Sequence, residues 1–128
     1  AVLTAKEALA MFEDLDDKQG KAEALLRVAQ MQVLSGVADE AAGNVLSARR
    51  LFQSLSDVSG EVEALLVFAD AYLQKGRGDQ AVRLTRDALA ICRDAGDHHE
   101  EARALRALAG MQASLVQKPA EGSAGPDA

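Results

Sequence analysis

An internal repeat with a period of 40 residues constrains the fold of this chain more than any other feature. When residues 12–51 are compared with residues 52–91, 13 of the 40 positions are identical. The stretch "GKAEALL" (20–26) returns as "GEVEALL" (60–66), and the other matches are mostly small or apolar residues with Gly and Asp between them. A fixed period of this length is typical of a helical solenoid, in which each unit buries its apolar faces only against its neighbours.

Each period predicts two helices. In the second period one apolar face has the i, i+3, i+4, i+7 spacing of a helix, and it consists of Leu65, Phe68, Ala69 and Tyr72. A second apolar stripe follows and consists of Ala81, Val82, Leu84, Thr85, Ala88 and Leu89. We expect six helices, at residues 1–16, 18–35, 38–56, 58–75, 78–95 and 98–115.

The phase of the repeat predicts one helical domain over residues 1–116. It divides into a half repeat (1–16), two full repeats (17–56 and 57–96) and a second half repeat (97–116). Residues 117–128 are expected to form a flexible tail, because "KPAEGSAGPDA" (118–128) is rich in Pro, Gly, Ser and Ala. The alternative is an ordered extension that packs on an exposed helix or on a partner.

Several residues are expected to begin and end these helices. Asp57 and Asp79 can each cap a helix by accepting a backbone N–H. Asp97 and Glu100 have the spacing of a capping box. Gly76 tolerates a positive φ and is expected to end the helix before it.

The repeat also predicts what lies between the helices. Ala29 and Ala69 are expected where two helices touch, and Gln80 is expected to be solvated. The last helix has three apolar residues that need cover from the preceding repeat, the tail, a second copy or another subunit, namely Leu105, Leu108 and Met111.

Two long segments resemble tetratricopeptide repeats: "AEALLRVAQMQVLSGVADEAAGNVLSARRL" (22–51) and "VEALLVFADAYLQKGRGDQAVRLTRDALAI" (62–91). The small positions and the turn glycines, Gly36 and Gly76, match the family pattern, whereas most aromatic positions and the Pro after the second helix do not. The period of 40 and the stretch "AGDHHEEARAL" (95–105) resemble the long-period branch of the family. The resemblance covers residues 1–115 and implies an all-α, right-handed helix-turn-helix solenoid.

Composition agrees with an all-α fold and excludes several classes of function. Hydrophobic residues make up 48% of the chain but aromatics only 3%, so the apolar residues are mainly the helix formers Ala and Leu. The net charge of −6 argues against nucleic acid as a partner, and no apolar run approaches the length of a transmembrane helix. The single cysteine fits a reducing compartment. We therefore expect an intracellular, soluble protein, with a processed or truncated N-terminus because the first residue is not Met.

We find no catalytic constellation, and we expect no enzymatic activity, no cofactor and no metal. His98 and His99 are adjacent, so on a helix they point about 100° apart and are better explained as a solvated first turn than as a metal site. Cys92 aligns with Phe52, which indicates a small core residue, with a reactive thiol as the alternative. The stretch "GRGD" (76–79) contains the integrin-binding tripeptide but is expected to be a turn between helices.

The resemblance implies that the first helices of the repeats form a concave face that holds a peptide or an amphipathic helix of a partner protein. The partner-binding residues that it implies are Glu23, Leu26, Gln30, Val33, Glu63, Leu66, Asp70, Leu73, Arg103 and Arg106. The spacing supports this, since the first four lie on a helix face distinct from the apolar stripe. Plain solvation of these side chains is the alternative.

The predicted function is therefore that of a non-catalytic scaffold or adaptor for protein–protein interaction. The Lys and Asn clamp of the chaperone-binding members is missing, which makes that role unlikely. Two alternatives stay open: an accessory subunit wedged into a large multi-subunit assembly, and a regulatory module cut from a larger signalling protein.

Overall fold

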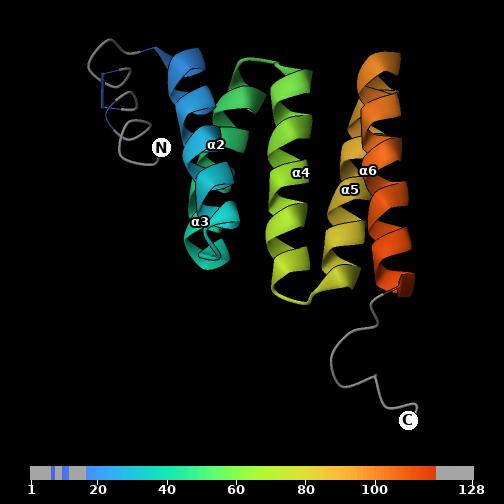
Figure 1. The fold of residues 1–128 in the computed structure, drawn as a ribbon. Helices are drawn as coiled ribbons and strands as arrows, with labels where there is room; N and C mark the ends of the chain where they lie inside the picture. Colours follow the sequence, from blue (N-terminus) through green and yellow to red (C-terminus); the bar gives the residue numbers. More distant parts are fainter. Residues whose placement is uncertain (1–6, 8–9, 12–16, 118–128) are drawn as a thin grey trace.

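The structure is a computed structural model that describes residues 7, 10–11 and 17–117. The described part holds five α-helices and no strand (Figure 1). The helices are α2 (Lys18–Leu34), α3 (Ala38–Ser54), α4 (Val58–Gln74), α5 (Gly78–Ala95) and α6 (His98–Gln117).

The all-α prediction is confirmed for these residues, and all five helices lie within two residues of their predicted bounds. The count among the described residues is five rather than six, because all of the helix expected at 1–16 except residues 7, 10 and 11 lies outside them. The tail predicted at 117–128 also lies outside them, except that α6 continues to Gln117. None of the described helices combines the length and the apolarity needed to cross a membrane.

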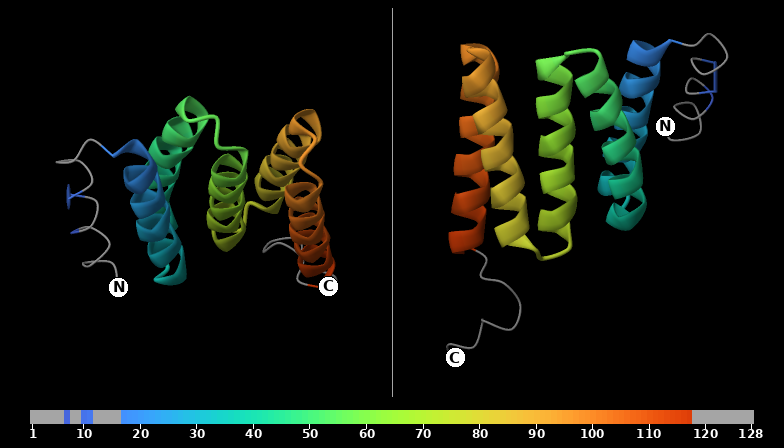
Figure 2. Two further views of the ribbon diagram at one scale, coloured as in Figure 1. Left: turned by 90° about the horizontal axis from the view of Figure 1, so that it is seen from above. Right: turned by 180° about the vertical axis from the view of Figure 1, so that it is seen from behind.

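The helices form two rows. The first helices of the repeats, α2, α4 and α6, lie in one row, and the second helices, α3 and α5, pack behind them (Figure 1; Figure 2 shows the rows from above). Each helix contacts the next along the chain, and α4 also contacts α2 and α6. Each second helix therefore lies between two first helices.

Aspartate caps begin the first helices. The carboxylates of Asp17 and Asp57 accept hydrogen bonds of 2.9 Å from the backbone N–H groups of Gly20 and Gly60. Asp97 accepts one of 3.1 Å from Glu100, which confirms the Asp half of the predicted capping box. The predicted cap at Asp79 is wrong, because α5 begins one residue earlier, at Gly78, after a residue with no side-chain cap.

The helices end where the chain adopts a positive φ. Gly36, Gly76 and Gly96 have φ values of 83°, 78° and 69°. Ser56 lies one period before Gly96, at the equivalent position, and has φ of 56°. It is the one described residue other than Gly with a positive φ, a conformation that costs energy for a residue with a Cβ.

The core consists of the predicted apolar stripes. Ala29 and Ala69 are fully buried at helix contacts, as predicted, and α3 and α5 contribute buried small residues in the same register. Gln80 is half-buried rather than solvated, and its Oε1 has no hydrogen-bond partner among the described residues. The prediction that this side chain is solvated is wrong, because its amide oxygen is buried even though α5 has the predicted bounds.

At one core contact the two repeats have large and small residues in opposite positions. In the first, the buried Phe52 ring lies so close to Gly60 that a Cβ there would be 2.3 Å from its Cδ1. One period later these positions hold Cys92, as a small core residue, and Glu100, whose larger side chain is also buried. The pair of large Phe52 and small Gly60 in the first repeat thus becomes small Cys92 and large Glu100 in the second. The exchange keeps the space between the helices filled.

Candidate functional site

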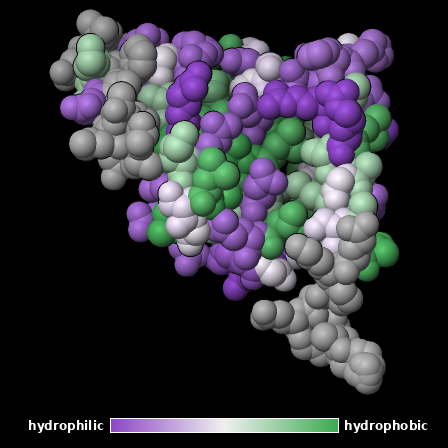
Figure 3. Space-filling view, viewed as in Figure 1, coloured by the Kyte–Doolittle hydropathy of each residue, from purple (hydrophilic) through white to green (hydrophobic). Residues whose placement is uncertain are grey.

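The first-helix face is the surface that α2, α4 and α6 form together. It faces the viewer in Figure 3, where hydrophobic side chains gather in patches among hydrophilic ones. Two grooves open between α2 and α4 on this face. Six of the ten predicted partner-binding residues line them, namely Glu23, Leu26, Gln30, Val33, Glu63 and Asp70.

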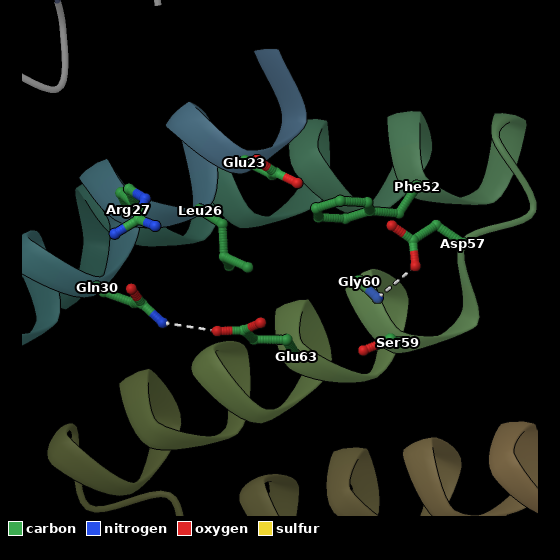
Figure 4. Close-up of a pocket in the computed structure, with 9 residues that line it drawn as sticks. All are labelled: Glu23, Leu26, Arg27, Gln30, Phe52, Asp57, Ser59, Gly60 and Glu63. Carbon is green, nitrogen blue, oxygen red and sulfur yellow. Dashed lines mark hydrogen bonds between the residues drawn. The ribbon is translucent and has the colours of Figure 1, made fainter. Parts of the chain in front are cut away.

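The polar groove has a volume of about 310 Å³ (Figure 4). Glu23, Arg27 and Gln30 reach it from α2, and Glu63 faces them from α4. The remaining lining residues are Leu26, Phe52, Asp57, Ser59 and Gly60. Acidic side chains, one basic side chain and one neutral amide therefore line this groove, and buried apolar side chains form its floor.

A network of polar contacts crosses the first-helix face and joins its three helices. The Gln30 amide donates a hydrogen bond of 3.2 Å to the Glu63 carboxylate, which also lies 3.7 Å from the Arg103 guanidinium of α6. Arg103 lies 3.4 Å from Glu100, and Glu100 accepts a hydrogen bond of 3.0 Å from the Ser59 hydroxyl. Three predicted site residues are therefore engaged with one another.

The apolar groove has a volume of about 290 Å³ and lies further along α2. Its lining residues are Gln30, Met31, Val33, Leu34, Val67 and Asp70. Met31 is 39% exposed and Leu34 80% exposed, which is a large apolar surface for neighbouring side chains on one helix. Exposed apolar patches of this kind mark interaction sites more often than isolated apolar residues do.

Asp70 stands beside this apolar surface. Its carboxylate makes no hydrogen bond or ion pair with any described residue, and the surrounding protein removes enough of its hydration to raise its pKa. An unpaired, partly desolvated carboxylate favours a cationic group that approaches it. The apolar groove therefore combines apolar contact surface with one negative charge that no described residue pairs with.

The other predicted residues have different environments. Leu26 is only 4% exposed and belongs to the core, so it cannot serve as an exposed anchor. Leu66 and Leu73 are half-buried and pack against the core clusters of the second repeat. Arg106 is exposed on α6 and lines neither groove.

Sequence reasoning missed Arg27, Met31 and Val67 among the residues of the grooves. The helix face that the resemblance implies includes positions 23, 26, 30 and 33 of α2. Each groove also includes the residue that follows one of these positions, namely Arg27 in the polar groove and Met31 in the apolar groove. The change from Met31 to Ala71 one period later is a sequence signal that could have identified Met31 as a groove residue.

The other candidate chemistry does not form a site in the described part of the chain. No group of three or more metal-ligating side chains occurs there. His98 is exposed and lies 3.6 Å from Glu101 in the same turn of α6. Cys92 is buried, and burial, followed by the nearby carboxylates of Glu100, Asp97 and Glu101, raises the pKa of its thiol. The thiol is therefore held in its protonated, unreactive form.

The chain matches no protein-family model, and a search of curated proteins returned no significant match. Its function must therefore be inferred from the geometry of the first-helix face.

Proposed function

We propose that this chain is a non-catalytic interaction module that binds an amphipathic peptide or helix of a partner protein between α2 and α4. The observation that carries the proposal is the apolar groove, where exposed Met31 and Leu34 lie beside the unpaired carboxylate of Asp70. The 40-residue repeat and the packing of successive helices support a tetratricopeptide-like solenoid of the long-period branch as its scaffold.

The chemistry of the groove specifies the partner. Apolar side chains of the Leu type would cover Met31 and Leu34 and supply most of the affinity. A Lys or Arg one helical turn away would pair with Asp70 and would fix the register of the bound segment. The polar groove extends the same surface toward Glu23 and Glu63, where further basic residues of the partner would lie.

Selection from a displayed library of random peptides tests this proposal, because such a library requires no identified partner. The enriched peptides should combine Leu-type residues with Lys or Arg, and their affinities are then measured by titration. Met31→Glu and Leu34→Glu should each weaken binding by about tenfold or more, because they place a charge on the contact surface. Asp70→Asn should weaken it less and should reduce its dependence on salt.

Leu46→Glu is the matched control. Leu46 is 39% exposed, like Met31, but it lies on α3, behind the first-helix face. Peptides whose binding depends on Leu46 and not on Met31 or Leu34 would contradict the proposal. Such a result would favour the accessory-subunit alternative, in which the second helices make the contacts.

A further inference from the structure

The apolar stripe of α6 lacks the cover that the same stripe has in α2 and α4. Ala102, Leu105 and Ala109 are all exposed, and Leu105 is 43% exposed. One period earlier these positions hold Val62, Leu65 and Ala69, and all three are fully buried. Two periods earlier they hold Ala22, Leu25 and Ala29, which are buried as well.

Second helices bury this stripe in the complete repeats. Leu65 of α4 lies in one core cluster with Ala88 and Cys92 of α5, which is the next helix along the chain. The buried stripe of α3 consists of Ala41, Val45, Ala48 and Phe52, and that of α5 of Ala81, Thr85, Ala88 and Cys92. An uncovered stripe that keeps the sequence of the buried ones indicates a missing second helix, since an end adapted to solvent would be polar there.

The residues that follow α6 do not carry the sequence of a second helix. At the positions equivalent to Ala81 and Thr85 they have Glu121 and Gly125, and Pro126 falls where the interior of the helix would lie.

The residues that precede α2 do have the sequence pattern of a second helix. At the positions of the buried stripe of α3 they have Ala1, Ala5, Ala8 and Phe12. Residues 1–16 thus have the apolar pattern of a second helix, which the residues that follow α6 do not have.

We propose that residues 1–16 of a second copy of this chain pack on the open stripe of α6 and complete a repeat shared between the two copies. The same chain cannot supply both parts, because residues 1–16 adjoin Asp17, the cap of α2, and α2 and α6 lie at opposite ends of the helix rows (Figures 1 and 2). Just as α3 lies between α2 and α4, residues 1–16 would lie between α6 of one copy and α2 of the next.

This contact is head-to-tail and joins two different surfaces. Each copy that has bound one neighbour still offers a free end, so the contact generates open chains rather than a closed dimer. It uses the exposed stripe of α6 and leaves the grooves between α2 and α4 free, so it is independent of the proposed peptide binding.

Sedimentation velocity of the full chain over a range of concentrations tests the proposal. The average sedimentation coefficient is expected to rise steadily with concentration, without a plateau at the dimer. Leu105→Arg, which alters α6, and Ala8→Arg, which alters the N-terminal segment, should each weaken self-association by about tenfold or more. Ala5→Arg is a second variant of the same segment, and Leu46→Arg is a control of similar exposure on α3.

Mixing the two variants gives the decisive measurement. The Leu105→Arg chain retains an intact N-terminal segment and the Ala8→Arg chain an intact α6, so together they should form a 1:1 complex and nothing larger. Such a complex also shows that both variants are folded. A wild-type chain that stays monomeric at every concentration would overturn the proposal, as would a mixture that does not associate. Loss of association on Leu105→Arg alone would indicate a symmetric contact between two α6 helices and would overturn it too.

Discussion

Replacing Gly60 by Ala tests whether the repeated glycine exists to admit an aromatic ring. The added Cβ would lie 2.3 Å from Cδ1 and 2.6 Å from Cγ of Phe52, far inside van der Waals contact. The ring is buried in the first core cluster and has little room to move. Overpacking of this kind costs about 1–3 kcal/mol, whereas Ala in place of a helical Gly stabilises by about 0.5–1 kcal/mol. The difference between these terms is a decrease in the free energy of unfolding of about 0–2.5 kcal/mol for Gly60→Ala.

Urea unfolding followed by far-UV circular dichroism measures this change. Gly43→Ala is the matched control, because Gly43 also lies within a helix but a Cβ there would meet nothing within 4 Å. It should stabilise the protein by about 0.5–1 kcal/mol. In a Phe52→Leu background Gly60→Ala should cost less than in the wild type, which measures the coupling of the two positions. If Gly60→Ala stabilises as much as Gly43→Ala, the steric reasoning is refuted.

Three further predictions concern the backbone, the core and the groove. Ser56→Gly should stabilise by about 0.5–1 kcal/mol in urea unfolding, because it relieves the positive φ, whereas Gly96→Ala should destabilise. Ala69→Leu should destabilise by about 1–3 kcal/mol at a fully buried helix contact, while Asp87→Leu on the exposed face of α5 should change the free energy of unfolding by less than about 0.5 kcal/mol. Asp70 has a raised pKa when folded, so its ionisation destabilises the fold as pH rises above the ordinary value of 3.8. Asp70→Asn should therefore raise the urea midpoint at pH 7 and leave it unchanged at a pH well below 3.8, and equal effects at both pH values would contradict this assignment.

The repeat made the helices predictable from the sequence. A period that returns with its Gly and Asp residues in place fixes where helices end and begin, and Asp57 caps α4 as expected. The cap predicted at Asp79 is wrong because the sequence shows only that Asp is a suitable capping residue. It does not show at which residue the helix begins. Asp79 instead contributes an acidic side chain to the first turn of α5, where a negative charge also suits the helix dipole.

The residues of the candidate site were less predictable, because a helix face does not reveal which of its side chains a neighbouring helix covers. Leu26 has the spacing of a surface residue, but it packs in a core cluster that includes Val67 of the next repeat. Gln32 has the position of an apolar residue, yet it is buried and accepts a hydrogen bond of 2.8 Å from Asn44. One period later the same two positions hold Tyr72 and Leu84, so an apolar pair replaces a polar one.

Differences between the repeats would give the proposed groove its specificity. The positions that are identical in both repeats mainly build helix ends and helix contacts, as Gly60 and Ala69 do. The apolar groove, by contrast, uses positions that change from one repeat to the next: Met31 becomes Ala71, and Leu34 becomes Gln74. If every repeat offered the same groove, a bound segment could slip by one period. A groove built from these changing positions, with the unpaired charge of Asp70 at its edge, would give the proposed partner a single register on the first-helix face.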